Sequence, residues 1–360
     1  MKSMTLIIAE AGVNHNGDES LALALIDAAH QAGVDVVKFQ TFKAANLVTQ
    51  QAKQAAYQTV NTGKEESQFA MLSRLELSFE SHLRLIAHCQ TLGIEFLSTA
   101  FDSESLEFLV NKLNLQTLKI PSGELTNAPF VLAHARTGCR LIVSTGMATL
   151  ADVEAALGVI AFGLTASQNA VPSESAFMAA YASEAGQNAL TEKVTLLHCT
   201  TEYPAPMVDI NLRAMDTLSH AFRLPIGYSD HSKGITIPVA AVARGACIIE
   251  KHFTLDRNME GPDHKASLEP DELSAMVQGI REVELALGDG IKGPRPSEIK
   301  NKEIARKSLV AACDIELGAT FSTTNLAIKR PGDGMSPYGY WNLLGKPSRR
   351  AYQAGELISE

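Results

Sequence analysis

The chain shows its clearest pattern in LPIGYSDHSKGITIPVAAVARGACIIEKHFT, residues 224–254. The apolar runs 225–230 and 247–253 predict two strands, and the small residues between them predict a helix that ends at a glycine. If the strands are parallel neighbours, their carboxyl ends meet at one edge, where His231 and His252 can reach the same pocket. The pair is either part of a metal site or two unrelated strand-end histidines, because two imidazoles alone leave a ligand shell incomplete.

The same alternation of strand and helix patterns covers the first 290 residues. Eight short, nearly continuous apolar runs are candidate strands: 6–12, 34–40, 94–100, 117–123, 140–146, 194–200, 225–230 and 247–253. Such runs are typical of strands covered on both faces, and amphipathic helical patterns separate them. Eight strand–helix units fit an α/β fold of the (β/α)8 TIM-barrel type. An open doubly wound sheet is the alternative, but the sequence has no GxxxxGK[ST] phosphate loop to favour it.

The composition narrows the class of protein. The 360 residues suit one large domain and one small one, and a hydrophobic content of 46% is ordinary for a globular core. A net charge of −9 without a Lys/Arg-rich run argues against nucleic-acid binding. No apolar run is long enough to span a membrane, and Glu10 interrupts the N-terminal apolar stretch, which argues against a signal peptide. Five scattered cysteines without a CxxC motif indicate reduced thiols in a cytoplasmic protein.

A TIM barrel predicts that polar side chains collect at the carboxyl ends of its strands, where barrel enzymes build their sites. The strand ends carry Glu10, Asn14, His15, Lys38, Gln40, Ser98, Thr99, Lys119, Ser122, Glu124, Ser144, Thr145, His198, Thr200, Tyr203, Ser229, His231, Glu250 and His252. Two buried lysines there, Lys38 and Lys119, indicate an anionic substrate. The alternative is that each lysine pairs with a glutamate such as Glu10 or Glu124.

The hydroxyls at the strand ends favour an anionic substrate over lysine–glutamate pairs. Ser122, Ser144 and Ser229 end three different strands, each in a tight turn. One such serine is usually only a cap, but three hydroxyls that converge near Lys119 are suited to cradle a phosphate or carboxylate.

Two insertions and a tail depart from the barrel pattern. Residues 41–79 follow the second strand on the active face and are expected to form a lid or a dimer contact. Residues 162–193 lie on the opposite face, where a structural role is expected. A Gly-, Pro- and charge-rich run at 288–303 reads as a linker. The predicted organisation is a barrel domain at 1–290, a linker at 291–303 and a small β-rich domain at 304–360.

Nine motifs match a known family in the right order: IIAEAGVNHNGD (7–18), VVKFQTF (36–42), LSTAFD (97–102), LKIPSGELTN (118–127), IVSTGMAT (142–149), LLHCTTEYPAP (196–206), IGYSDHS (226–232), EKHFT (250–254) and GPDH (261–264). The chain resembles the N-acetylneuraminate (sialic acid) synthases and their legionaminate and pseudaminate synthase siblings. The tail, with ARKSLVA and IKRPGDG, resembles their antifreeze-like (SAF) domain. The resemblance implies a TIM barrel followed by a SAF domain, in a domain-swapped homodimer where each SAF domain covers the partner's barrel mouth.

The resemblance also implies a transferase reaction. Phosphoenolpyruvate would condense with an open-chain N-acetylmannosamine-type aldose to give N-acetylneuraminate and phosphate, with C–O cleavage. The reaction would need Mn²⁺ or Mg²⁺, held by His231 and His252. The alternative is legionaminate synthesis from 2,4-diacetamido-2,4,6-trideoxymannose. Two other classes are a Schiff-base aldolase that uses Lys119 and a non-enzymatic carbohydrate- or ice-binding protein, which would not need buried strand-end Lys, Glu and His.

By resemblance, the site residues divide according to the group that they would contact. The phosphate would be held by Lys119, Ser122, Ser144, Ser229 and Thr201. The phosphoenolpyruvate carboxylate would lie near Lys38 and Thr99. Water would be oriented, or protons moved, by Glu10 and Glu124. The sugar hydroxyls would contact Gln40, Tyr203 and Asp263. Arg330, which the sequence alone favours as a solvated charge, would reach across to the acceptor's N-acetyl group in the partner's barrel.

Overall fold

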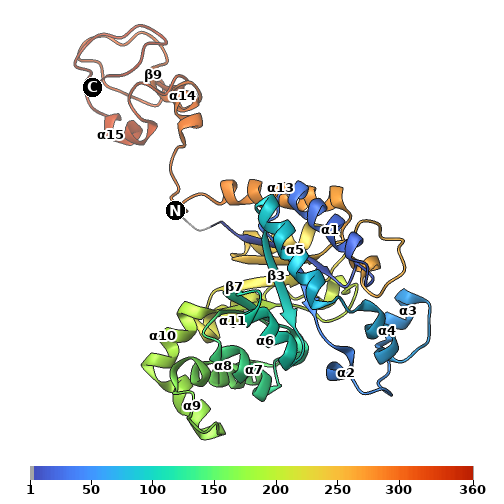
Figure 1. Ribbon diagram of the computed structural model, residues 1–360. Coiled ribbons are helices and arrows are strands. Elements are labelled where there is room, and N and C mark those ends of the chain that lie inside the picture. Colours follow the sequence, from blue (N-terminus) through green and yellow to red (C-terminus); the bar gives the residue numbers. More distant parts are fainter. Residues whose placement is uncertain (1–3, 360) are drawn as a thin grey trace. The chain divides into compact units, whose positions relative to one another are not determined.

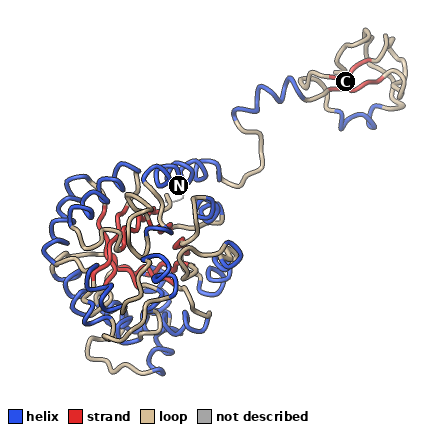
Figure 2. Tube along the Cα trace, turned by 90° about the vertical axis from the view of Figure 1, so that its right-hand side faces the viewer, coloured by secondary structure: helices blue, strands red, loops and turns tan. Residues whose placement is uncertain are grey.

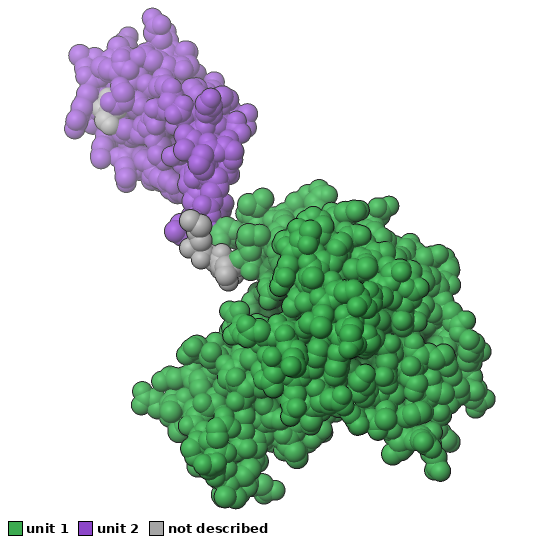
Figure 3. Space-filling view, in the orientation of Figure 1, with its two compact units in different colours: residues 1–288 green, residues 289–360 purple. Residues whose placement is uncertain are grey.

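A computed structural model describes residues 4–359 of the chain. The first three residues of the N-terminal stretch discussed above therefore lie outside the described residues, as does Glu360. The chain forms two compact units, Met1–Gly288 and Asp289–Glu360, shown in green and purple in Figure 3. Among the described residues, no helix is both long and apolar enough to cross a membrane.

The first unit is a closed barrel of eight parallel strands in sequence order. The strands are β1 (Leu6–Gly12), β2 (Val36–Thr41), β3 (Glu95–Ala100), β4 (Thr117–Ile120), β5 (Arg140–Ser144), β6 (Val194–His198), β7 (Ile226–Asp230) and β8 (Ile248–His252). All eight predicted strands form, and β1 pairs with β8 to close the barrel. The predicted strand 117–123 ends early, because Ser122–Glu124 turn into the short 3₁₀ helix η1. The TIM-barrel prediction is confirmed.

Helices surround the strands, as the blue and red traces of Figure 2 show. The barrel helices are α1 (Glu19–Ala32), α5 (Phe79–Leu92), α6 (Ser103–Asn111), α7 (Ala128–Arg136), α8 (Leu150–Thr165), α11 (Ala214–Phe222), α12 (Thr236–Ala243) and α13 (Pro270–Leu287). Sequence signals fix their ends locally. The Asp18 side chain accepts hydrogen bonds from the backbone amides of Ser20 and Leu21 at the start of α1, and Gly33 ends that helix with φ 77°. The main core lies between these helices and the outer face of the strands.

Two insertions leave the regular pattern. After β2 the chain forms α2 (Ala44–Leu47), α3 (Ala56–Thr62) and α4 (Gln68–Leu75), which gather on one side of the barrel in Figure 1. Between α8 and β6 it forms α9 (Glu174–Ala182) and α10 (Glu184–Lys193). The ring of Phe177 on α9 packs against Phe162 on α8 with centroids 5.3 Å apart. The second insertion thus extends the outer helical layer before a strand begins, away from the carboxyl ends of the strands.

The second unit is a small domain with its own core. Its strands β9 (Ser308–Ala311) and β10 (Leu326–Lys329) pair in antiparallel fashion, and α15 (Tyr340–Leu343) follows a short 3₁₀ turn. The stretch expected to be a linker contains a regular helix, α14 (Pro296–Ala305), because a proline at its first turn and Glu298 bonding back to the Arg295 amide start it well. The run GDGIKG at 288–293 has the spacing of a dinucleotide fingerprint, but it follows a helix and not a strand.

Candidate active site

A cavity of about 330 Å³ opens at the carboxyl ends of the barrel strands. Beneath it lies an apolar layer inside the barrel, formed by Ile8, Val36, Leu97, Ile142, Leu197 and Ile248. Side chains two residues further along a strand point to the same face. The next layer is therefore Glu10, Lys38, Thr99, Ser144, Cys199 and Glu250, all of which line the cavity. The alternation of each strand places the polar layer directly on an apolar floor.

Of the fifteen residues that the family resemblance assigns a role, fourteen line this cavity: Glu10, Lys38, Gln40, Thr99, Lys119, Ser122, Glu124, Ser144, Thr201, Tyr203, Ser229, His231, His252 and Asp263. The exception is Arg330, which belongs to the second unit and is exposed, with its Nε donating to the carbonyl oxygen of Ala305 at 3.0 Å. Six other polar residues expected at the strand ends do not line it: Asn14, His15, Ser98, Thr145, His198 and Thr200. All described residues that line the cavity belong to the first unit. The structure therefore brings the barrel residues together without Arg330.

The two lysines of the cavity floor pair with two glutamates. Lys38 Nζ lies 2.6 Å from Glu10 Oε2 and 3.6 Å from Glu250 Oε2, and it donates to Thr99 Oγ1 at 3.1 Å. Lys119 Nζ donates to both carboxylate oxygens of Glu250 at 2.9 and 3.1 Å. All four charged groups are buried. The pairing of lysines with glutamates is confirmed, but Glu250 takes the place that the sequence suggested for Glu124.

Glu124 and Glu250 have different surroundings for a geometric reason. Glu124 lies in η1, beyond the end of β4, and its carboxylate accepts a hydrogen bond from Asn127 Nδ2 at 2.7 Å. Glu250 points into the barrel from β8 and also accepts from Ser229 Oγ at 3.0 Å. The sequence held a signal for Glu250, since it lies two residues before His252 on one strand and so faces the same way.

The surroundings of the two buried glutamates move their pKa values apart. Burial raises the pKa of Glu10, and the charge of Lys38 opposes that shift only in part. Burial acts in the same direction on Glu250, but Lys119 and Lys38 outweigh it and hold the pKa of Glu250 well below its ordinary value. Carboxylates whose pKa values diverge in this way are suited to different roles, one to carry a proton and one to stay ionised. Glu10 is the better candidate for proton transfer.

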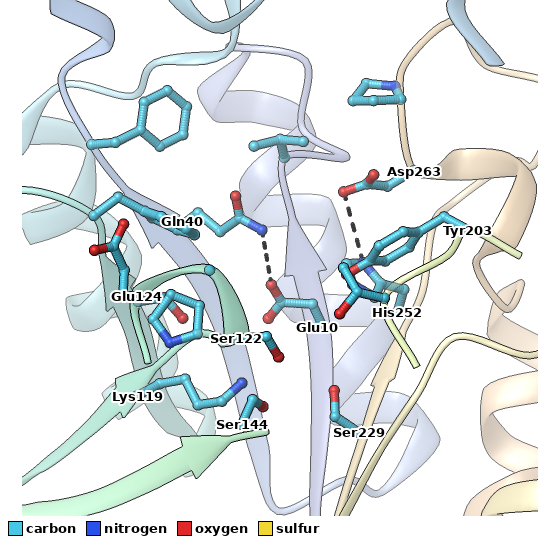
Figure 4. Close-up of a pocket in the computed structure, with 18 of the residues that line it drawn as sticks. Glu10, Gln40, Lys119, Ser122, Glu124, Ser144, Tyr203, Ser229, His252 and Asp263 are labelled. Atoms are coloured by element: carbon cyan, nitrogen blue, oxygen red, sulfur yellow. Dashed lines mark hydrogen bonds and ion pairs between the residues drawn. The ribbon is translucent and has the colours of Figure 1, made fainter. Parts of the chain in front are cut away.

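Hydroxyls converge at one end of the cavity, where Figure 4 shows Lys119, Ser122, Ser144 and Ser229 near one another. Ser122 Oγ accepts a hydrogen bond from the backbone amide of Gly146 at 3.0 Å. A Cβ at Gly146 would lie 2.2 Å from Thr201 Oγ1 and 2.8 Å from Ser122 Oγ, so only glycine lets these groups approach.

Two hydroxyls in this part of the cavity lack partners. Ser144 Oγ and Thr201 Oγ1 are buried and have no hydrogen-bond partner among the described residues. Buried polar atoms are rarely left unpaired, because the loss of their hydrogen bonds to water costs free energy. Unpaired hydroxyls next to a buried lysine fit a polar, anionic ligand.

The two histidines face each other beside this end. Their ring centroids lie 5.5 Å apart, and the Tyr203 ring packs 4.1 Å from that of His231. His231 Nδ1 donates to the carbonyl oxygen of Thr200 at 2.6 Å, which leaves its Nε2 as the nitrogen with a free lone pair. His252 Nδ1 is buried, has no hydrogen-bond partner and lies 3.9 Å from Asp263 Oδ2 (Figure 4).

Burial keeps both imidazoles neutral. It lowers the pKa of His231 to about 4 and the pKa of His252 well below the ordinary value. Among the described residues, no group of three or more His, Cys, Asp and Glu side chains is arranged to hold a metal ion. Two neutral imidazoles with available nitrogens still fit a divalent ion that keeps its other positions for substrate and water.

A third side of the cavity is apolar, and the sequence reading missed it. Val13, Phe42, Met71 and Leu75 are buried together, with Leu47, Leu72 and Phe101 packed against them, and all seven line the cavity. We refer to these seven residues as the apolar wall. Three of them lie on α4, whose residues were expected only to cover the site or contact a partner. The spacing of Met71, Leu72 and Leu75 on one helical face was the available signal.

Comparisons with known proteins agree with this geometry. The profile of the NeuB family matches residues 25–292. The chain belongs to the NeuB family. This NeuB-family chain is 50% identical to the N,N'-diacetyllegionaminic acid synthase of Campylobacter jejuni over 356 residues, which cover 99% of each chain. It is 44% identical to the enzyme of the same name from Legionella pneumophila, over 99% of this chain and 94% of that one.

Other relatives share the family but carry other names. The human N-acetylneuraminate-9-phosphate synthase is 32% identical over 98% of this chain and 91% of its own. The crystal structure of the N-acetylneuraminic acid synthetase from Leptospira borgpetersenii matches with a TM-score of 0.66 at 33% identity, covering 83% of this chain and 90% of that one. This NeuB-family chain is thus an enzyme of the sugar-acid synthase kind. Of the two acceptor chemistries expected from the sequence, the relatives favour the legionaminate alternative over N-acetylneuraminate.

Proposed function

We propose that the protein condenses phosphoenolpyruvate with 2,4-diacetamido-2,4,6-trideoxymannose to form N,N'-diacetyllegionaminate and phosphate. The observation that carries the proposal is one cavity in which two buried lysines, unpaired hydroxyls and two neutral histidines meet. The choice of acceptor is supported by the 50% and 44% identity to two legionaminic acid synthases over nearly the whole chain. N-acetylmannosamine is the second candidate acceptor, supported by the more distant sialic-acid synthase relatives.

The two lysines divide the anionic groups of phosphoenolpyruvate between them in this proposal. Lys119 holds the phosphate, together with Ser122, Ser144, Ser229 and Thr201. Lys38 lies near the carboxylate, with Thr99 fixed by the hydrogen bond from Lys38 Nζ. Because the glutamates already balance both lysines, an arriving anion must compete with Glu250 and Glu10 for them. The unpaired hydroxyls supply donors that no glutamate occupies.

The proposed chemistry joins two carbons and breaks one C–O bond. The enol carbon of phosphoenolpyruvate attacks the aldehyde carbon, and the aldehyde oxygen takes up a proton. Water adds to the second carbon of the former phosphoenolpyruvate and gives up one proton, which balances the proton taken up by the aldehyde oxygen. The bond from this carbon to the phosphate oxygen then breaks, the new hydroxyl becomes the ketone carbonyl, and its proton leaves with the phosphate. Glu10, with its raised pKa, is suited to carry a proton in these steps, and Glu124 lines the same cavity as a second carboxyl. Gln40, Tyr203 and Asp263 are proposed to contact the sugar hydroxyls.

We propose that His231 and His252 hold Mn²⁺ or Mg²⁺. When bound, the ion would act as a Lewis acid that polarises the aldehyde oxygen. The hydrogen bond from His231 Nδ1 to the Thr200 carbonyl supports this assignment, because it fixes the ring with Nε2 toward the cavity. Equilibrium dialysis with Mn²⁺ tests it without turnover: the wild type should bind the ion, and His231→Ala should not while it keeps its circular dichroism spectrum. Equal binding by both proteins would remove the assignment.

We propose further that the second unit is a SAF domain that acts in a cytoplasmic, domain-swapped homodimer. Its exposed Tyr338 and Trp341, 91% and 74% accessible, support a surface that another subunit covers. Arg330 would then contact the acceptor in the partner's barrel. The variant Arg330→Ala should raise the KM for the acceptor by about tenfold, as loss of one hydrogen bond to a charged group predicts, and leave phosphoenolpyruvate binding unchanged. An unchanged acceptor KM would count against the swapped arrangement.

The reaction is tested by phosphate release from phosphoenolpyruvate in the presence of Mn²⁺. Release with the diacetamido sugar that stops in EDTA supports the proposed function. Release only with N-acetylmannosamine would replace the acceptor and keep the reaction. Release with neither sugar, together with borohydride trapping of a keto substrate on Lys119, would establish the aldolase instead. Tight sugar binding without turnover under any metal would indicate a binding protein.

A further inference from the structure

The cavity has two chemically different ends. In Figure 4, Lys119, Ser144 and Ser229 lie at one end, and Gln40 and Asp263 lie toward the other. The apolar wall completes the cavity from the segments that follow β1, β2 and β3, including α2 and α4. Of the three serines, Ser122 follows β4, whereas Ser144 and Ser229 lie on β5 and β7. Three residues of the wall, Val13, Phe42 and Phe101, come two to four positions along the chain after the floor residues Glu10, Lys38 and Thr99. An occupant that reaches the wall therefore extends away from the floor, where the lysines and the glutamates lie.

The wall is held in place before any ligand arrives. The backbone amide of Lys43 donates to Asp102 Oδ2 at 2.9 Å, and that of Ala44 donates to Glu76 Oε1 at 2.6 Å. These bonds tie the start of the insertion to the loop after β3 and to the end of α4. Asn61 Nδ2 donates to the carbonyl oxygen of Pro262 at 2.7 Å, which joins α3 to the loop that carries Asp263. A preformed wall can discriminate between ligands, because it does not rearrange to suit each one.

We propose that the apolar wall selects the acceptor by its end far from the aldehyde, and that it prefers an end bearing methyl groups to one bearing hydroxyls. This inference rests on the proposed function. The diacetamido trideoxy sugar has a methyl group at carbon 6 and an acetamido group at carbon 4, where N-acetylmannosamine has two hydroxyls. A hydroxyl pressed against Phe42, Leu72 or Phe101 loses its hydrogen bonds to water and gains no partner. A methyl group in the same place is removed from water at no such cost.

Two glutamines of the same insertion suit the acetamido group. Gln58 on α3 and Gln68 on α4 both line the cavity. Gln58 Oε1 already accepts from the Ala55 amide at 2.9 Å, so its amino group is the part suited to donate to the C=O of an acetamido group. The Gln68 carboxamide can both donate and accept. The wall thus combines apolar surface for methyl groups with amide groups for the nitrogen substituent.

Leu72→Gln tests the inference. Leu72 is only partly buried, so a polar side chain of similar size can be accommodated on α4. The measurement is kcat/KM for both acceptors, with the KM for phosphoenolpyruvate and the melting temperature as checks. The variant should lose about 10- to 100-fold for the diacetamido sugar and lose less, or gain, for N-acetylmannosamine, as the usual discrimination by a few apolar groups predicts. Leu47→Asn, on a different helix, should shift the ratio in the same direction.

The matched control is Phe69→Gln, on the same helix and also partly buried but not among the residues that line the cavity. Its ratio of the two kcat/KM values should equal that of the wild type. If Leu72→Gln and Leu47→Asn lower both acceptors equally, the wall has no role in selection and the inference fails, although the proposed function stands. If the wild type turns over neither sugar, the proposed function itself fails.

Discussion

Strands β7 and β8 carry a group of buried charges on each of their two faces. Facing the cavity, Glu250 binds Lys119 and Lys38, next to hydroxyls that lack partners. Facing away from it, Lys251 Nζ binds Asp230 Oδ2 at 2.6 Å and also the carbonyl oxygen of Ser232. Neither side chain of this second pair is exposed, and neither has an unpaired nitrogen or oxygen.

The two groups use the same kinds of residue at adjacent positions, so burial and charge alone do not mark a functional site. The difference lies in what surrounds them. The inner group borders a cavity and leaves polar atoms unsatisfied, as a ligand site does. The outer group is closed, and it holds the residues on both sides of His231, because Asp230 Oδ1 accepts from the Ser232 amide at 3.0 Å. We assign the outer pair to stability and the inner one to binding.

Breaking the outer pair should have the largest effect, on stability. Lys251→Met leaves Asp230 as an unpaired buried charge, which typically costs about 3–5 kcal/mol. Urea denaturation of the two proteins measures the difference. The double variant Lys251→Met/Asp230→Asn should recover part of the loss, because asparagine is neutral and keeps an oxygen for the Ser232 amide. A single variant as stable as the wild type would mean that the pair is not structural.

Breaking the inner group should affect turnover more than stability. Lys119→Met removes a cation from the proposed phosphate site, and we expect phosphate release to fall by about 10²–10³-fold, as loss of one preorganised electrostatic contact usually does. In this variant Glu250 still has Lys38 as an ion-pair partner, with Lys38 Nζ 3.6 Å from Glu250 Oε2, and this limits the loss of stability. Lys112→Met, an exposed lysine after α6, is the control and should match the wild type. Normal phosphate release by Lys119→Met would contradict the division between the two groups.

Filling the space between the hydroxyls should have a smaller effect. The added methyl of Gly146→Ala meets Thr201 Oγ1 and Ser122 Oγ, so these groups must move by enough to cost about 1–3 kcal/mol. We expect the KM for phosphoenolpyruvate to rise, while the acceptor KM stays nearly constant. Gly293→Ala is the control, because nothing lies within 4 Å of its Cβ and its φ is not in the left-handed region, so its KM for phosphoenolpyruvate should equal that of the wild type. An unchanged phosphoenolpyruvate KM would show that the hydroxyls do not form the anion cradle.

His134 is a buried ionisable residue of a third kind, because it stays neutral. Its replacement should change stability least of all at neutral pH. Burial lowers the pKa of His134 to about 4, and its Nε2 has no partner. Since the unfolded chain binds the proton more tightly, with a pKa of 6.5, this histidine's contribution to stability is present above pH 6.5 and is lost as pH falls toward 4. By pH 5 the loss is about 2 kcal/mol. His134→Gln should therefore lose less stability than the wild type between pH 7 and pH 5, and parallel curves would contradict the assignment.

Much of the barrel could be read from the sequence because its signals are local. Each strand is a short apolar run, and a residue two positions after a buried one faces the same way, which placed Glu10, Lys38 and His252 correctly in the cavity. The site prediction was weaker where the chain leaves the regular pattern. Glu124 was named with Glu10 as a possible lysine partner, but it lies in η1 beyond the end of β4, and Lys119 pairs with Glu250 instead. Residues 291–303 were predicted to be a linker because of their composition, and this prediction did not anticipate the helix α14.

The sequence by itself determined the eight strands, the polar layer at their carboxyl ends and the family, because these depend on residue order and on spacing along single segments. Only the tertiary structure decided which charges pair and which residues form the apolar wall. Lys119 and Glu250 are 131 positions apart, on β4 and β8, and meet because the barrel closes through β1 and β8. The wall likewise joins residues after three strands with one face of α4. Such contacts depend on closure of the whole sheet, which no local pattern encodes.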